Sequence, residues 1–143
     1  MRAMYDKLDT YLTECSSELA SDDYWYDLGF EYATEMLENF KEEDWERLEN
    51  QLDKKTLMWK KRLIYCLGDN ETSKELDIII NLTNTEDEEL FVMCIDALRE
   101  VANSGNKEKI LFAQIVERAG TLIPKSGIAT KKILERFVSQ FSV

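Results

Sequence analysis

The stretch of sequence at residues 87–101, DEELFVMCIDALREV, has apolar side chains around nearly the whole circumference of a helix. Acidic residues open the stretch, an apolar run follows, and the pair Ala97 and Leu98 stands near its end. A helix that is apolar on all sides has to be packed against neighbours on more than one side. The stretch therefore predicts a helix over about 86–102 that lies inside an array of helices.

A second stretch with the same property, LMWKKRLIYCLGD at residues 57–69, comes earlier in the chain. The two stretches can be overlaid at an offset of 31 residues, which places Leu63 on Cys94 and Leu67 on Leu98. A period of roughly 30 to 40 residues built from helix pairs is typical of an α-solenoid. The first and last helical segments have only one apolar face, as expected of helices that cap such a stack.

Helical periodicity extends over the rest of the chain, and one proline and five glycines are too few for a turn-rich β fold. Helix start signals stand at Ser21, Thr56, Thr72 with Glu75, and Thr85 with Glu88. Gly68 and Gly120 are placed to end helices. The expected helices cover about 2–20, 23–41, 44–53, 57–67, 73–82, 86–102, 107–119 and 128–141. We predict an all-α fold, a short α-solenoid of about four helical hairpins that forms a single domain over residues 1–143.

Residues 56–102 resemble HEAT repeats. The stretch at 87–101 is similar to the second helix of a HEAT repeat, with its acidic start, its apolar run and its small residue followed by leucine, and residues 57–69 are a looser copy. The resemblance implies HEAT-like hairpins stacked into an α-α superhelix.

The charge of the chain is unevenly distributed. The net charge is −11, and residues 1–53 hold 16 acidic against 4 basic residues, while residues 54–143 hold 13 against 14. An acidic first third attracts basic surfaces and repels nucleic acid. We therefore expect a basic protein partner and no nucleic acid.

The residue inventory argues against catalysis. There is no histidine, so the commonest general base and the commonest metal ligand are both missing. No nucleophile–base pair, metal-ligand cluster or phosphate-binding loop can be assembled from the remaining residues. We predict that the protein is not an enzyme and that it uses no metal and no cofactor.

The three cysteines Cys15, Cys66 and Cys94 each fall at an apolar position of an expected helix. An odd number without close spacing indicates buried free thiols in a reducing compartment. No apolar run is long enough for a membrane span, and the first residues carry a charge every few positions, unlike a signal peptide. These features predict a cytoplasmic protein with no membrane partner.

Five basic residues occur in the stretch KKTLMWKKR at residues 54–62. Lys60, Lys61 and Arg62 are consecutive, so they point about 100° apart on a helix and cannot form one phosphate-binding patch. We expect them to pack their stems against neighbours and to pair with acids of the first third.

The expected helix at 23–41 combines aromatic rings with carboxylates and contains one basic residue, at its end. A regular helix places an apolar set on the inner side, with Tyr26 and Phe30 at its edge: Trp25, Leu28, Tyr32, Ala33, Met36, Leu37 and Phe40. The carboxylates form a continuous row on the other side. Such a row is usually a solvated face, but no lysines interleave it to relieve the repulsion between like charges. We therefore predict a partner-binding surface formed by Asp23, Tyr24, Asp27, Glu31, Glu35, Glu38, Glu42, Asp44 and Glu46.

In size, helical-repeat build and acidic, ring-bearing face, the chain resembles immunity proteins of bacterial toxin systems, including the contact-dependent growth inhibition type. The resemblance implies a protein that binds a cognate, basic nuclease toxin domain and covers its active site. Two alternatives stay open. A helical-repeat adaptor would bind a cytosolic protein or peptide on its concave side, and a nucleic-acid mimic would use the same carboxylates against DNA-binding proteins.

Overall fold

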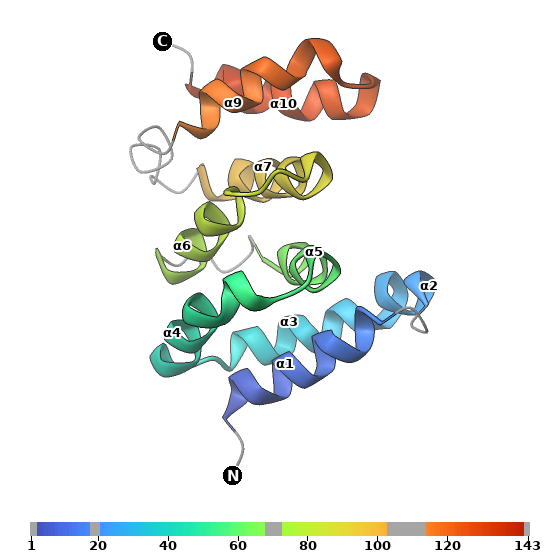
Figure 1. Cartoon of the computed structure of the whole chain (residues 1–143), viewed down its shortest axis with the longest axis vertical. Coiled ribbons are helices and arrows are strands. Elements are labelled where there is room, and N and C mark those ends of the chain that lie inside the picture. Colours follow the sequence, from blue (N-terminus) through green and yellow to red (C-terminus); the bar gives the residue numbers. More distant parts are fainter. Residues whose placement is uncertain (1–2, 18–20, 68–72, 103–113, 142–143) are drawn as a thin grey trace. The chain divides into compact units, whose positions relative to one another are not determined.

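The computed structural model describes residues 3–17, 21–67, 73–102 and 114–141. Throughout these ranges the regular structure is helical and contains no strand. The chain divides into two compact units, Met1–Asn70 and Glu71–Val143. Figure 1 shows the first unit in blue to green and the second in yellow-green to red. The predicted all-α, repeat-like fold is confirmed for the described residues, whereas the single domain over residues 1–143 stays a prediction.

The first unit is built around α1 (Met4–Cys15). Its next helix runs without a break through three segments, namely α2 (Asp22–Tyr24), η1 (Trp25–Gly29) and α3 (Phe30–Glu38). Then follow α4 (Glu42–Gln51), the short 3₁₀ turn η2 (Leu52–Lys54) and α5 (Leu57–Tyr65). Helix α1 packs against α3, α4 and α5, and α3 also packs against α5 (Figure 1). This packing places α3 beside both α1 and α5, with one face left for solvent.

The core of the first unit consists of the apolar positions that recur along these helices. Its buried side chains include Leu8, Leu12, Trp25, Ala33, Leu37, Leu48, Leu52 and Leu63.

Two of the expected helix start signals in the first unit are confirmed. The hydroxyl of Ser21 accepts a hydrogen bond from the amide of Tyr24, and that of Thr56 accepts one from the amide of Trp59, both at 3.2 Å. Each satisfies an amide that the first turn of a helix leaves unpaired.

The second unit contains α6 (Ser73–Leu82), α7 (Glu88–Ala102), α9 (Ile115–Leu122), the 3₁₀ turn η3 (Ile123–Lys125) and α10 (Ile128–Phe141). Helix α7 packs against α6 and α10, and α9 packs against α10. Arg118 on α9 donates to the carbonyl oxygen of Thr83 at 3.0 Å, and its guanidinium lies 4.2 Å from the ring centre of Phe91. The arginine thus fixes α9 to the segment that joins α6 and α7.

Several expected helix boundaries are corrected. Gly120 lies inside α9 and does not end it, and residues 121–125 continue as helix and not as a connector. The residue that caps α7 is Asp87 and not Thr85, because the Asp87 carboxylate accepts the amide of Leu90 at 2.8 Å. The hydroxyl of Thr85 accepts the amide of Asp87 instead. Gly68, the capping pair at Thr72 and most of the helix expected at 107–119 lie outside the described residues.

Helix α5 is less enclosed than its sequence suggests. Trp59, Leu63 and Ile64 are buried, but Leu57, Met58 and Tyr65 are exposed. The prediction that this helix is packed on all sides is therefore wrong for three of its apolar positions.

Candidate functional site

The scaffold of the site is the continuous helix from Asp22 to Glu38, which contains a π-helical turn over η1. In a π-helix each amide bonds five residues back, so the turn is wider than that of an α-helix. Because the turn is wider, residues spaced four apart stay on one side of the helix. The buried residues of this helix have that spacing, and they are Trp25, Gly29, Ala33 and Leu37. Strict α-helical geometry would rotate such a line steadily around the helix.

The π-turn overturns part of the predicted inner face. Leu28 and Tyr32 were expected to point into the core, but they are 50% and 49% exposed. Trp25, Ala33 and Leu37 are buried as predicted, and Phe30 lies at the edge. The prediction failed because it assumed 3.6 residues per turn over a segment that has more.

Gly29 is what allows the π-turn to close over Trp25. A Cβ atom at this position would lie 3.0 Å from the Trp25 ring and 3.3 Å from the Tyr24 ring. Contacts this short would displace both rings. The glycine therefore holds Trp25 in the core while its neighbours in sequence face outward.

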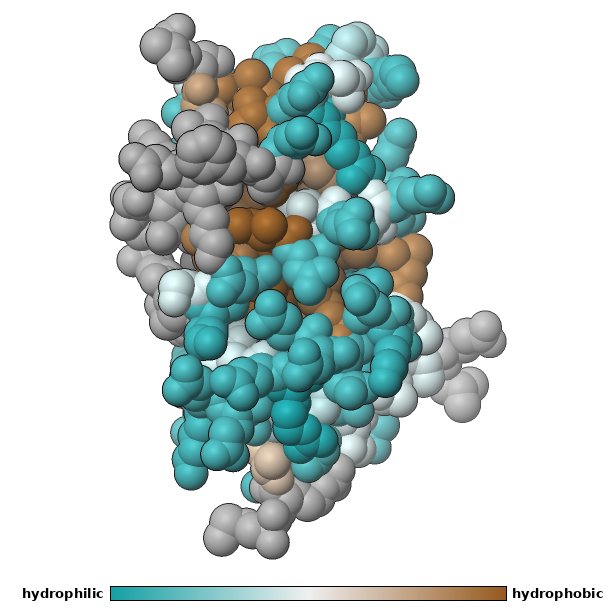
Figure 2. All heavy atoms as spheres, turned by 60° about the vertical axis from the view of Figure 1, so that its left-hand side comes forward, coloured by the Kyte–Doolittle hydropathy of each residue, from teal (hydrophilic) through white to brown (hydrophobic). Residues whose placement is uncertain are grey.

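Eight of the nine predicted site residues are exposed. They are Asp23, Tyr24, Asp27, Glu31, Glu35, Glu38, Glu42 and Glu46. Figure 2 shows that hydrophilic side chains cover much of the surface of the first unit in this view. We call Asp23, Asp27, Glu31, Glu35 and Glu38 the acidic ridge.

Asp44 does not belong to this surface, and its assignment is corrected. Its side chain is only 5% exposed. One carboxylate oxygen accepts the amide of Tyr5 at 3.0 Å and the other accepts the amide of Lys41 at 2.9 Å. Asp44 therefore caps α4 and ties it to the start of α1.

Other acids of the first unit have basic partners. Asp6 pairs with Arg47 at 2.9 Å and Asp9 with Lys55 at 2.7 Å. Within the described part of the chain, no ion pair reaches any carboxylate of the acidic ridge. The ridge thus differs from Asp6 and Asp9 of α1, whose charges are paired within the unit.

Arg62 of α5 joins α1 to the helix that carries the acidic ridge. Its guanidinium is buried, lies 5.2 Å from the ring centre of Trp25, and donates to the carbonyl oxygen of Cys15 at 3.3 Å. It also pairs with Asp22, the first residue of α2. The predicted pairing of the basic stretch with the acidic third is confirmed for this residue.

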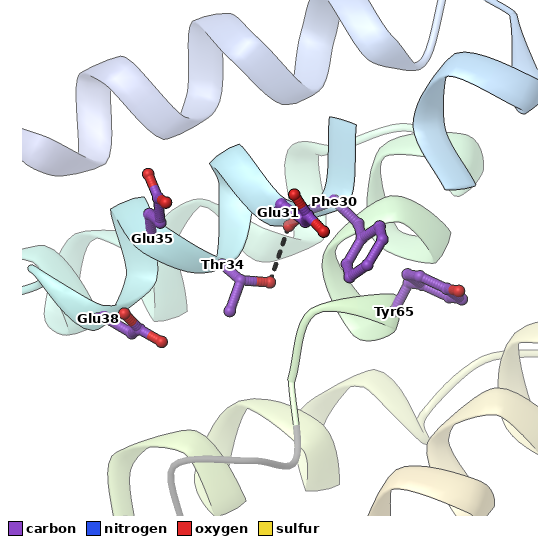
Figure 3. A pocket seen from close by; sticks show the side chains of 6 residues that line it. All are labelled: Phe30, Glu31, Thr34, Glu35, Glu38 and Tyr65. Atoms are coloured by element: carbon purple, nitrogen blue, oxygen red, sulfur yellow. Dashed lines mark hydrogen bonds between the residues drawn. The ribbon is translucent and has the colours of Figure 1, made fainter. Parts of the chain in front are cut away.

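An open depression of about 490 Å³ lies along the ridge, and α3 provides most of its lining. Its lining residues are Phe30, Glu31, Thr34, Glu35, Glu38 and Tyr65 (Figure 3). The rings of Phe30 and Tyr65 meet edge to face at one end, with centroids 5.5 Å apart, and Glu38 stands at the other end. The Thr34 hydroxyl between them donates to the carbonyl oxygen of Phe30 at 2.8 Å. The depression thus combines three carboxylates with an aromatic end wall.

Sequence reasoning missed Tyr65 and gave Phe30 no role in binding. The two rings come from different helices, and no periodicity within one helix reveals such a contact. The available signal was the pair Tyr26 and Phe30, spaced by one turn beside the carboxylates. Tyr26 also contacts Tyr65, at 5.1 Å between centroids.

A second group of rings lies on the other side of the ridge. Tyr11 of α1 meets Tyr32 edge to face at 6.2 Å, and its hydroxyl lies 3.1 Å from that of Tyr24. Burial, with a smaller effect of the bond to Tyr24, raises the pKa of Tyr11 above its ordinary value. The phenol therefore stays neutral and adds no charge to the surface.

The cysteines are free and buried, as predicted. Burial raises the pKa of the Cys94 thiol to about 12 and that of Cys15 above its ordinary value. Thiols of this kind are poor nucleophiles, because the reactive species is the thiolate. Among the described residues no group of three His, Cys, Asp or Glu side chains is arranged to hold a metal ion.

Comparison with protein-family models, with curated proteins and with solved structures found no match to this chain. None of the described helices combines the length and the apolar character needed to cross a membrane. Function is therefore inferred from the geometry and the charge of the site.

Proposed function

We propose that this protein is an immunity protein that binds a basic nuclease toxin domain and neutralises it by covering the active site. The observation that carries the proposal is the open depression of the first unit, in which Glu31, Glu35 and Glu38 lie without ion-pair partners among the described residues. Carboxylates left unpaired in this way repel one another, and a basic partner would relieve the repulsion.

The chemistry of a nuclease matches such a surface. An active site that binds a polyanion is lined with cationic side chains, and a row of carboxylates presents negative charge where phosphates would lie. Complementary fields can raise the association rate to roughly 10⁸ M⁻¹s⁻¹ or more at low salt. The exposed rings beside the ridge, Tyr26 and Tyr65 among them, provide the aromatic contacts that slow dissociation in many interfaces.

The proposal includes the compartment and the mode of action. Free thiols suit the cytoplasm, where an immunity protein protects the cell that makes it. Binding would need no catalytic residue, no cofactor, no nucleic acid and no membrane. The resemblance to HEAT-like immunity proteins of contact-dependent growth inhibition systems agrees with this function.

The test uses any basic toxin domain that is encoded beside the gene. Co-expression should restore growth to cells that make the toxin, and calorimetry should detect a complex. The double variant E31Q/E35Q should weaken the complex by about tenfold or more. The matched control E117Q/E135Q removes the same charge from exposed positions of the second unit and should bind like the original protein. Equal loss in both variants would show that only net charge matters and would overturn the proposed site.

A helical-repeat adaptor is the second candidate, and one feature of the second unit supports it. An open depression of about 410 Å³ there is lined by the apolar side chains of Val92, Met93 and Leu122 and by polar residues that include Glu88 and Lys125. A mixed lining of this kind suits a peptide. If no neighbouring basic toxin binds, this depression becomes the site to test.

A further inference from the structure

Three large apolar side chains form an exposed row on the helix that carries the acidic ridge. Tyr24, Leu28 and Tyr32 follow one another at intervals of four residues and are 42%, 50% and 49% exposed. We call these three residues the apolar row. Single exposed apolar residues are normal on a protein surface, but adjacent ones on one helix form a continuous strip, and strips of this kind mark interaction sites.

The π-turn accounts for the exposure of two members of the apolar row, Leu28 and Tyr32. Regular helical geometry would turn Leu28 and Tyr32 toward the core together with Trp25, whereas in the structure Trp25 and Gly29 of the π-turn are buried and Leu28 and Tyr32 are about half exposed. The protein therefore places an extra residue in the turn and leaves Leu28 and Tyr32 about half exposed, on the same side as Tyr24. A π-turn inside a longer helix is frequently found at a functional site.

A row of carboxylates runs parallel to the apolar row. Asp23, Asp27 and Glu31 have the same spacing of four residues and are exposed. Each row extends for roughly 12 Å, since eight residues of helix rise about 1.5 Å each. The surface thus consists of two parallel strips, one apolar and one negative, repeated at each turn of the helix.

We propose that the apolar row and the carboxylates beside it bind an amphipathic basic helix of the partner. Side chains one turn apart on a second helix match this repeat, with an apolar stripe against the row and Lys or Arg along one edge against the carboxylates. These carboxylates favour a basic partner, because Asp23, Asp27 and Glu31 form no ion pair with any basic residue that the structure describes. Within the proposed function, on which this inference rests, the helix is the part of the toxin that anchors the complex.

The two rows have separable effects on binding. Apolar burial is insensitive to salt and determines how slowly a complex dissociates, whereas exposed charges control association and are screened by salt. Leu28 contributes no charge and Asp27 contributes no apolar surface. Substitutions at these two positions therefore separate the two contributions.

The first experiment uses a synthetic helical peptide of about 18 residues, built with a leucine stripe, arginine along one edge and alanine elsewhere. The original protein should bind it, and L28S should weaken binding by about tenfold. A matched peptide with glutamate in place of arginine should not bind. The control L57S, at an exposed apolar position of α5, should bind the arginine peptide like the original protein. Failure of the arginine peptide to bind, or equal loss in L28S and L57S, would overturn the inference.

The second experiment measures the kinetics of the toxin complex. L28S should raise the dissociation rate about tenfold and leave the salt dependence of association unchanged. D27N should lower the association rate at low salt and reduce its salt dependence. A toxin that binds the original protein but dissociates equally fast from L28S and L57S would contradict the inference and leave the proposed function standing. If the toxin does not bind but the arginine peptide does, the proposed function is wrong and the helix-binding surface is supported.

Discussion

Arg62 and Asp22 form an ion pair whose two sides lie in opposite environments. The Nη2 atom of Arg62 lies 2.5 Å from a carboxylate oxygen of Asp22. The arginine side chain is 6% exposed and the aspartate side chain is 74% exposed. The pair joins α5 to the first residue of the helix that carries the acidic ridge.

This asymmetry predicts that removing the exposed partner costs more than removing the buried one. D22A leaves the guanidinium of Arg62 in the interior without its anion, and we expect a loss of about 2 kcal/mol in the free energy of unfolding. R62M removes the charge and keeps most of the buried volume, so we expect a loss of about 1 kcal/mol. Urea unfolding of the purified variants measures both values.

The control for this comparison is D23A. Asp23 is the next residue of the same first turn and has no ion pair with a described residue, so D23A reports the loss of helix-dipole stabilisation alone. A loss in R62M that equals or exceeds that in D22A would refute the account of the pair.

Gly29 and Gly120 should respond to alanine in opposite directions. G29A adds a methyl group 3.0 Å from the Trp25 ring, and we expect it to lower the free energy of unfolding by about 1–3 kcal/mol. G120A adds a methyl group with no atom within 4 Å, inside α9, and should stabilise the protein by about 0.5–1 kcal/mol. Thermal unfolding followed by circular dichroism gives both signs. Stabilisation by G29A would mean that the π-turn does not depend on this glycine.

Charge reversal on the acidic ridge should separate folding from binding. The double variant D27K/E31K converts the repulsion of positions 27 and 31 by Asp23 and Glu35, one turn away on either side, into attraction, so it should fold as well as the original protein or slightly better, by a few tenths of a kcal/mol. The same change should lower the affinity for the basic partner by about a hundredfold if the carboxylates contact buried cationic side chains of that partner. Binding measured at low and at physiological salt checks the second part. An unchanged affinity would exclude the ridge as a contact surface.

The buried thiol of Cys94 should make stability depend on alkaline pH. Its pKa is raised from 9.0 to about 12 in the folded protein, so the folded state holds this proton more tightly than the unfolded state. This contribution to stability is complete below pH 9 and is lost as the pH rises from about 9 toward 12. Between pH 8 and pH 10 the original protein should lose about 1 kcal/mol more than C94A. Parallel pH profiles of the two proteins would contradict the burial of this thiol.

The sequence was sufficient to predict the helical class, because apolar residues at helical spacing mark buried faces whatever their neighbours are. It was not sufficient at Leu28 and Tyr32. Their exposure depends on a π-turn in which the Trp25 ring lies over Gly29 and contacts Arg62 and Tyr65 of α5. A pattern read along one helix assumes regular geometry and does not contain this information.

Part of the candidate site could also be predicted from the sequence. The exposed carboxylates of the ridge followed from their spacing along one helix. Asp44 did not, because an acid that caps a helix and an acid on a solvated face look alike in a list of charges. Tyr65 was missed because it meets Phe30 across 35 residues of chain. The contact of Phe30 with Tyr65 and the bond from Tyr5 to Asp44 both join segments that are distant in the sequence.

The contact between Asp44 and Tyr5 has a further consequence for following the protein in solution. Amides in the first turn of a helix are usually open to water, and Tyr5 belongs to the first turn of α1. Its amide is covered because a carboxylate from α4, 39 positions away, accepts it. Exchange of this single amide with deuterium therefore requires α4 to move away from α1. The exchange rate of the Tyr5 amide, followed by nuclear magnetic resonance, would therefore report how often α4 separates from α1 in the first unit.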